Sequence, residues 1–445
     1  MASTPAPPPI PRRSGRPRRT IFFGWWIALA GAGLQLLQGT VLGQAYGAYA
    51  VVLRQEFGWS KTLLSGASAL REMESGLTGP VQGWFLDRFG AKNVARLGIV
   101  TLAAGLILFS RTTNPVNFYV SFVIMALGAS MMGYLTLTYT VVQWFERRRS
   151  TALSLVSMGG ALGGVILPVT VVLSMNTYGW RPTAFASGIL VLLVGLPLCQ
   201  LLYNTPAEKG MLPDGVTLEE AATPERVALA ASEADFTLRE ALRTPAFWWV
   251  SFGHGSSLFV VSAVNVHLLL HLTESQGYTL GQASQVMSLI TAMFLIGNIG
   301  GGIIGDYASK RLLAICAMQM HMIGLLLISH AAGTPMVIAG AIVHGLAWGG
   351  RGPQMAAIRA EYFGRSSFGK IMGVSNGIII IGTIAGPLIA GYVYDTTGSY
   401  RIGFDILAAM SGAGAVFFVL ARRPRPPLRA TEAKAEERDA VESAR

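Results

Sequence analysis

One short charged loop occurs twice in this chain, and each copy joins two long apolar segments. The copies span Gly83–Lys92 and Gly302–Arg311, and both hold an aspartate at the same position. Corresponding positions lie 219 residues apart, as the pairs 83 and 302 or 87 and 306 show, and Pro168 and Pro387 keep this spacing. A spacing that holds over this length indicates a duplicated unit, so we predict two related halves.

The composition identifies what surrounds both halves. Of the residues, 52% are hydrophobic and only 13% are charged, whereas a soluble protein has about 25% charged residues. A transmembrane helix needs roughly 20 mostly apolar residues. We therefore predict an all-α membrane protein with about twelve transmembrane helices in two pseudo-symmetric six-helix bundles. The apolar runs lie near residues 22–53, 61–86, 93–112, 116–144, 150–175, 182–203, 245–272, 280–304, 312–331, 335–357, 369–393 and 402–421.

Residues 204–243 interrupt the apolar pattern and divide the two halves. Three prolines and eight Asp/Glu occur there against four Lys/Arg, a composition typical of a polar linker that is partly disordered or carries a short surface helix. The expected organisation is a tail at 1–20, a six-helix bundle at 21–203, the linker at 204–243, a second bundle at 244–421 and a tail at 422–445.

The net charge of +11 comes from Lys and Arg residues that lie mostly on one side of the predicted membrane segments. Only five of the 34 Lys/Arg fall in loops assigned to the outer side, two lie inside apolar runs, and the others lie on the inner side. This is the positive-inside pattern, which predicts a multi-pass protein of the cell (inner) membrane with both termini and the linker in the cytoplasm. Nucleic-acid binding by the basic tails is the alternative, but topology accounts for the charge, so the lipid bilayer is the expected partner.

The repeated loop resembles the signature loop of the major facilitator superfamily. The first copy reads G-x-x-x-D-R-x-G-x-K, and the second has Tyr307 and Ser309 where Arg and Gly are usual. With the acidic linker, the resemblance covers essentially the whole chain and implies a secondary transporter. Phe23–Trp26 and Phe57–Ser60 are similar to segments of the bacterial relatives of monocarboxylate and oxalate/formate porters.

That group commonly engages the substrate carboxylate through an arginine in its eighth helix, and in some members a lysine in the eleventh helix assists. Here the runs at 280–304 and 371–393 contain neither Arg nor Lys. The resemblance therefore does not carry the substrate class over to this chain.

Charged side chains inside apolar runs are costly and are functional candidates by default. Arg71, Glu72 and Glu74 lie near the middle of the run at 61–86. In one interpretation Arg71 and Glu74 form an internal ion pair that only neutralises the helix. In the other, Glu74, or Glu72 on a different face, exchanges a proton while Arg71 responds to its charge, which would couple transport to protons.

The run at 335–357 holds the best candidate for binding an anion. Arg351 stays charged and offers a planar fork that matches a carboxylate. His344 and Trp348 share its helical face, and nearby glycines leave room for a ligand or a bend before Pro353. The alternatives are that Arg351 pairs with Glu72 or Glu74, or that it is a gate residue beside Glu361.

Further polar residues predict the rest of a solute cavity. They are uncharged or aromatic, as suits a small organic solute held by a few directional bonds, although such residues also bridge helices in membrane bundles. From four different runs we select Gln35, Gln38 and Tyr46, then Tyr134 and Thr138, then His254 and Asn265, and finally His344, Trp348 and Arg351.

The repeated loops predict the gates. Asp87 and Asp306 are expected at the inner ends of helices, where they can pair with Arg147–Arg149, with Arg365 and with helix termini. We assign Arg88, Lys92 and Arg311 to the same gates.

No phosphate loop, catalytic triad or nucleotide-binding motif occurs, so we predict neither an enzyme nor a cofactor. His267 and His271 have a zinc-capable spacing, but no carboxylate motif accompanies them, and no metal site is predicted. The expected function is a monomeric secondary carrier that moves a small organic anion, coupled to protons. A drug or metabolite efflux antiporter and a membrane receptor or scaffold are the alternatives.

The predicted topology can be tested by thiol labelling after Cys199 and Cys316 have been replaced. A single cysteine in the linker should resist a membrane-impermeant maleimide in intact cells and react once the membrane is permeabilised, because the linker carries the inner-side charge pattern. A cysteine in the loop after Arg111 should react in intact cells. Labelling of the linker cysteine in intact cells would contradict the topology.

Overall fold

The computed structural model describes residues 21–42, 45–223 and 235–427, and these residues form helices and no strand. The elements of the first half are α1 (Phe23–Leu42), α2 (Ala45–Phe57), α3 (Lys61–Phe89), α4 (Ala91–Phe109), α5 (Pro115–Met132), α6 (Tyr134–Trp144), α7 (Arg149–Tyr178) and α8 (Trp180–Gln200). Those of the second half are α12 (Pro245–Leu270) with a π-helical turn at His271–Ser275, α13 (Leu280–Tyr307), α14 (Lys310–Ser329), α15 (Thr334–Phe363), α16 (Phe368–Thr397) and α17 (Tyr400–Leu420).

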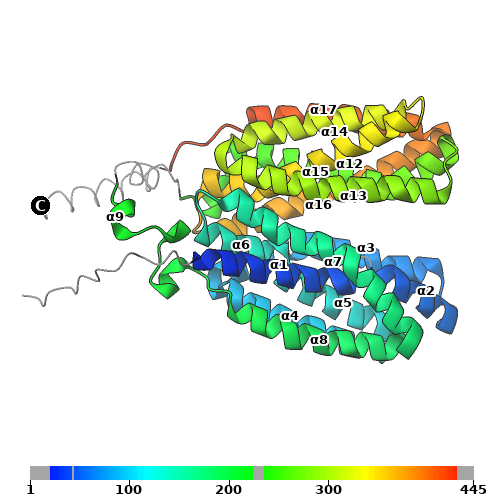
Figure 1. The fold of residues 1–445 in the computed structure, drawn as a ribbon, viewed down its shortest axis with the longest axis horizontal. Helices are drawn as coiled ribbons and strands as arrows, with labels where there is room; N and C mark the ends of the chain where they lie inside the picture. Colours follow the sequence, from blue (N-terminus) through cyan, green and yellow to red (C-terminus); the bar gives the residue numbers. More distant parts are fainter. Residues whose placement is uncertain (1–20, 43–44, 224–234, 428–445) are drawn as a thin grey trace, which may run out of the picture.

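The two halves form two elongated helical bundles that lie side by side (Figure 1). Within the described residues, eight helical segments are long and apolar enough to cross a membrane by length and composition. The charged helix α3 is not among them, because it carries Arg71, Glu72 and Glu74. The predicted all-α membrane fold with two related bundles is confirmed.

Local sequence signals set the helix boundaries. Thr279 begins α13 with a capping box, in which its side chain accepts from the Gln282 amide while the Gln282 side chain accepts from the Thr279 amide. Gly90 separates α3 from α4 at a φ of 77°, a left-handed conformation that favours glycine. Reversals of this kind return the chain through the bundle without long loops.

The bundles approach each other most closely where α3 crosses α16. A Cβ atom added to Gly83 would lie 2.1 Å from the Gly369 carbonyl oxygen, and one added to Gly373 would lie 2.2 Å from the Gly79 carbonyl oxygen. Such backbone contact requires glycine, which is a common way for membrane helices to associate. It brings the two bundles together at one end of the molecule.

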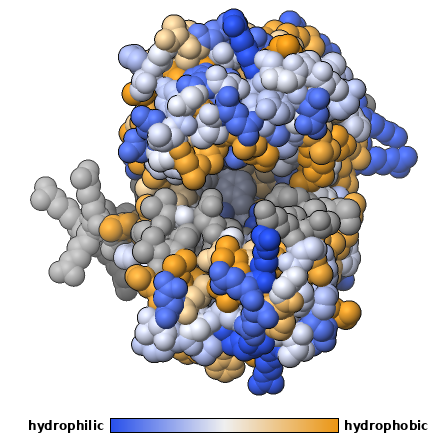
Figure 2. All heavy atoms as spheres, turned by 90° about the vertical axis from the view of Figure 1, so that its right-hand side faces the viewer, coloured by the Kyte–Doolittle hydropathy of each residue, from blue (hydrophilic) through white to orange (hydrophobic). Residues whose placement is uncertain are grey.

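That end also holds the linker and both ends of the described chain (Figure 1), and we call it the linker end. The linker contains short helices, α9 (Leu218–Ala221) and α11 (Leu238–Leu242), and residues 224–234 lie outside the described part. At the opposite end the surface is hollowed between the two bundles (Figure 2).

Candidate solute site between the bundles

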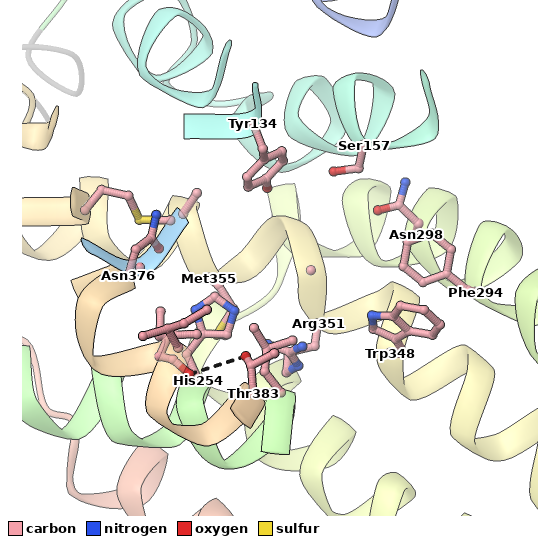
Figure 3. A pocket seen from close by; sticks show the side chains of 17 residues that line it. Tyr134, Ser157, His254, Phe294, Asn298, Trp348, Arg351, Met355, Asn376 and Thr383 are labelled. Carbon is pink, nitrogen blue, oxygen red and sulfur yellow. Dashed lines mark hydrogen bonds between the residues drawn. The ribbon is translucent and has the colours of Figure 1, made fainter. Parts of the chain in front are cut away.

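A cavity of about 400 Å³ lies between the bundles and draws its walls from both of them. This volume is within the range of small-molecule sites, roughly 300–1,000 Å³. Most of its described lining residues come from α12, α13, α15 and α16, with one each from α3, α6 and α7 (Figure 3). The polar side chains in the lining are Tyr134, Ser157, His254, Asn298, Arg351, Asn376 and Thr383.

Arg351 is the charged residue of the described lining. Its side chain is 1% exposed, and its Nε and Nη1 atoms have no hydrogen-bond partner among the described residues. Two of the alternative partners considered from the sequence are bonded elsewhere, because Glu361 pairs with Lys310 at 3.0 Å and the Glu74 carboxylate accepts from Thr78 at 2.8 Å. The side chain of the third, Glu72, lies outside the described part of the structure. Arg351 therefore presents a buried guanidinium in which Nε and Nη1 are bound by no described residue.

Glycines position Arg351 in the wall of the cavity. A Cβ on Gly349 would lie 2.0 Å from the Phe294 carbonyl oxygen, and one on Gly301 would lie 2.4 Å from the Gly350 carbonyl oxygen. The glycines next to Arg351 thus allow α15 to touch α13, in addition to the room for a ligand that the sequence suggested. This contact places α13 and α15 side by side in one wall.

Aromatic rings form the apolar part of the site. Trp348 packs against Phe294, with ring centroids 4.6 Å apart. Tyr134 opens α6 directly after Gly133, whose extended backbone interrupts the α5–α6 rod. Broken helices in a membrane are tolerated where they line a cavity. The break therefore accounts for the position of Tyr134 across from Trp348 and Arg351 (Figure 3).

A second buried arginine, Arg359, contrasts with Arg351 because the protein satisfies it. Its Nε and Nη2 atoms donate to the Ser375 hydroxyl at 3.1 and 2.7 Å, and its Nη1 atom donates to the Met355 carbonyl oxygen at 2.5 Å. Its Nη2 atom also lies 3.5 Å from Nδ1 of the cavity residue His254. Arg359 thus ties α15 to α16 and α12.

Four of the ten residues predicted to bind the solute line this cavity: Tyr134, His254, Trp348 and Arg351. The polar face of the first membrane helix does not contribute to the described lining. Gln38 donates to the Ala129 carbonyl oxygen at 2.9 Å, and the Tyr46 hydroxyl donates to the Leu64 carbonyl oxygen at 2.6 Å. Both therefore bridge helices of the first bundle. Gln35 is buried in the same bundle, away from the described lining.

The other three predicted residues also lie outside the described lining. His344 is buried against His321, with their Nδ1 atoms 3.1 Å apart, between α14 and α15. Thr138 is buried in α6, and Asn265 is exposed on α12. Within the described residues no three His, Cys, Asp or Glu side chains are grouped as a metal site.

The described lining receives Gly76 from α3 and none of the described charged side chains of that helix. Glu74 is partly buried, is bonded to Thr78 one turn later, and is close enough to Arg71 to feel its charge. The side chain of Glu72 lies outside the described part of the structure.

Two aspartates close the linker end, and they do so in the same way. Asp306 accepts hydrogen bonds from the Ser150 and Thr151 amides at the N-terminus of α7, at 2.8 and 3.3 Å. Asp87 accepts from the Gly369 and Lys370 amides at the N-terminus of α16, both at 3.2 Å. Each carboxylate thus crosses to the other bundle and meets the unpaired amides and positive dipole end of a helix.

A third contact lies between these two. Arg365 pairs with Glu146, a residue 219 positions earlier, so the pair joins equivalent positions of the two halves. The predicted pairing of the aspartates with helix termini occurs, but their predicted pairing with Arg147–Arg149 or Arg365 is wrong. Arg365 is bound to Glu146, and the Arg147 amide donates to Asp214 of the linker at 3.0 Å.

The other basic residues assigned to the gates have different positions. Lys92 donates to the Gln200 carbonyl oxygen at 3.0 Å, within the first bundle. Arg88 is exposed, and Arg311 lies near Tyr362 on α15, within the second bundle. The cation that does meet Asp87 is Lys370, whose Nζ atom lies 3.7 Å from the carboxylate.

Comparison with known proteins agrees with this arrangement. The family model described as Major Facilitator Superfamily matches residues 27–320 and 250–444. The chain belongs to the major facilitator superfamily. Transporters of this superfamily carry small-molecule solutes, so this chain is a multi-pass membrane transporter by family.

Individual members of the superfamily resemble the chain over most of its length. An MFS-type transporter of Gibberella moniliformis is 26% identical over 407 residues, 90% of this chain and 90% of that protein. Human monocarboxylate transporter 11 is 23% identical over 418 residues, 91% of this chain and 84% of that protein. The crystal structure of the human organic anion transporter MFSD10 has a TM-score of 0.63 at 17% identity, covering 89% of this chain and 97% of that chain.

The contact of Asp87 with the N-terminus of α16 leads to a prediction for transport. Replacing Asp87 with Asn should slow solute exchange in proteoliposomes by roughly tenfold, because a charge-assisted contact that holds one conformation is lost. Affinity, measured by thermal shift, should change much less, since Asp87 lies outside the cavity. The matched control is Asp395→Asn, an exposed aspartate at the opposite end. Equal loss of exchange and affinity in Asp87→Asn would assign Asp87 to folding instead.

Proposed function

We propose that this transporter moves a small organic anion, most simply a carboxylate, by alternating access. The observation that carries the proposal is the buried guanidinium of Arg351 in the cavity wall, with Nε and Nη1 unpartnered among the described residues. A charge at this depth is costly and requires a partner. An anionic group that enters with the solute would supply that partner, and the planar fork of arginine matches a carboxylate.

The rest of the lining supports an organic solute rather than an inorganic ion. Trp348, Phe294, Met355 and Ile379 give the cavity a largely apolar wall, which suits the carbon skeleton of a small molecule. The names of two similar proteins, an organic anion transporter and a monocarboxylate transporter, agree with this solute class.

The direction of access follows from the proposed topology. The linker end is closed by Asp87, Asp306 and the Glu146–Arg365 pair, whereas the opposite end is hollowed. With the linker and termini in the cytoplasm, as the basic residues favour, this conformation would receive solute from outside a cell membrane. Breaking the three contacts would then open the cytoplasmic side. We propose that the carrier works as a monomer, since one chain supplies both walls of the cavity.

We also propose that protons are coupled to transport through Glu74. It is a partly buried carboxylate on α3, the helix that packs directly against α16 of the other bundle. A desolvated carboxylate can be neutral in one conformation and ionised in another, which is the property that a coupled carrier needs. Arg71, which acts on Glu74, would adjust this balance.

The anion proposal predicts the effect of replacing Arg351 by Lys. Exchange should fall by about tenfold or more, because an ammonium cannot reproduce two parallel bonds to a carboxylate. Counterflow of labelled carboxylates in proteoliposomes measures this, after a thermal-shift screen has selected the solute. Arg111→Lys, an exposed position at the open end, is the control and should exchange normally. Normal exchange by Arg351→Lys, or a cationic solute, would overturn the proposal in favour of an efflux antiporter.

The coupling proposal predicts a separate effect for Glu74. Glu74→Gln cannot change its charge, so exchange should continue while the dependence of net transport on a pH gradient is lost. Glu208→Gln, on the exposed linker, is the matched control and should keep the pH dependence. A pH response that survives in Glu74→Gln would remove Glu74 from the coupling mechanism. The absence of counterflow for every solute would instead favour the receptor or scaffold alternative.

A further inference from the structure

Asn298 of α13 is a fully buried amide in the wall of the cavity, at the point where the two bundles meet. Its Nδ2 atom donates to the Ser154 carbonyl oxygen at 2.9 Å and lies 3.0 Å from the Ser154 hydroxyl oxygen. The Ser154 hydroxyl in turn donates to the backbone oxygen of Asn298 at 2.6 Å. The amide is therefore held from α7, the helix whose N-terminus Asp306 caps.

These contacts fix which way the amide points. A backbone carbonyl can only accept a hydrogen bond, so the atom of Asn298 that faces the Ser154 carbonyl oxygen must be the nitrogen. Its Oδ1 atom then faces away from Ser154, and it has no hydrogen-bond partner among the described residues. Figure 3 shows the nitrogen of Asn298 on the side of α7 and the oxygen turned toward the middle of the cavity.

Two kinds of unused polar atom therefore belong to one wall. Among the described residues, Nε and Nη1 of Arg351 are donors without a partner, and Oδ1 of Asn298 is an acceptor without one. The contact of α15 with α13 at Gly349 and Gly350 brings the two residues to the same side, and the Gly352 backbone lies beside the Asn298 oxygen. A buried acceptor without a partner costs about 1–3 kcal/mol, so a ligand that supplies a donor regains that free energy.

We propose that Oδ1 of Asn298 accepts a hydrogen bond from a hydroxyl group of the solute. The preferred solute is then a hydroxylated organic anion rather than a plain carboxylate. The inference rests on the proposed function, because Arg351 must hold the anionic group. The solute group that donates to Asn298 is a hydroxyl rather than an ammonium. An ammonium would add a positive charge beside Arg351, and the described lining contains no Asp or Glu to neutralise it. Sites that bond a substrate hydroxyl reject the analogue that lacks it, because the buried acceptor is then left unpaired.

The test compares pairs of solutes that differ by one hydroxyl group. The panel holds short aliphatic and aromatic monocarboxylates, each with a hydroxylated counterpart, and affinities come from competition for counterflow in proteoliposomes. The wild type should prefer the hydroxylated member of the best-bound pair by about tenfold, the value of one buried hydrogen bond. Asn298→Leu, which keeps a similar side-chain volume, should reduce this preference to about twofold or less while the plain carboxylate still binds.

The variant Ser154→Ala tests whether recognition of the solute hydroxyl depends on the side-chain contact between the two bundles. It removes the Ser154 hydroxyl bonds to Asn298 but leaves the carbonyl oxygen that orients the amide. Exchange rates can change in this variant, whereas the preference for the hydroxylated member should remain. Because the readout is a ratio measured on one variant, partial loss of folded protein does not alter it.

The outcomes distinguish this inference from the proposed function. If carboxylates bind in an Arg351-dependent manner but the wild type shows no hydroxyl preference, the inference is overturned and the anion carrier stands. The inference is also overturned if Asn298→Leu keeps the preference, or if Ser154→Ala loses it as completely as Asn298→Leu does. If no carboxylate competes at all, the proposed function fails and the inference fails with it.

Discussion

The two aspartates that cross from one bundle to the other are the contacts on which this conformation depends. Asp87 and Asp306 occupy equivalent positions in the two halves, and each binds the first free amides of a helix in the opposite half. Because α3 and α16 share backbone contact at Gly83 and Gly369, the Asp87 carboxylate reaches its amides directly, and the close approach of Gly302 to Ser150 and Ser154 does the same for Asp306 on α7. The bundles are thereby closed at the linker end and hollowed at the other, which leaves a cavity between them.

The wall of the cavity holds polar atoms that no described residue binds. Arg359 and Arg351 are equally buried, yet Arg359 is bonded to Ser375 and the Met355 carbonyl oxygen, whereas Nε and Nη1 of Arg351 lack partners among the described residues. In our proposal this difference separates a structural arginine from one that binds the solute. In our proposal the Asn298 amide adds an acceptor to the same wall and is anchored to α7, so solute recognition and closure of the linker end share one helix.

The sequence predicted the fold well because duplication and apolar run lengths constrain it strongly. It also predicted that Asp87 and Asp306 meet helix termini, since their equivalent positions place them at helix ends. It did not predict that Gln38 and Tyr46 are bonded to carbonyls of neighbouring helices, because a polar stripe on a membrane helix looks the same whether it faces a cavity or bridges to a neighbour. It also did not select Asn298, although Ser284 and Thr291 precede this amide at seven-residue steps on one helical face, and that spacing was the available signal.

The most direct test of the central claim uses the unmodified protein and one matched pair of ligands. Calorimetry on the purified transporter would compare the tightest-binding carboxylate with its neutral amide, which has nearly the same shape but no charge. If Arg351 holds an anion in the cavity, the carboxylate should bind at least about tenfold more tightly, as a charge-assisted bond to a buried guanidinium requires. Equal affinity for the two, or tighter binding of the corresponding amine, would contradict the account.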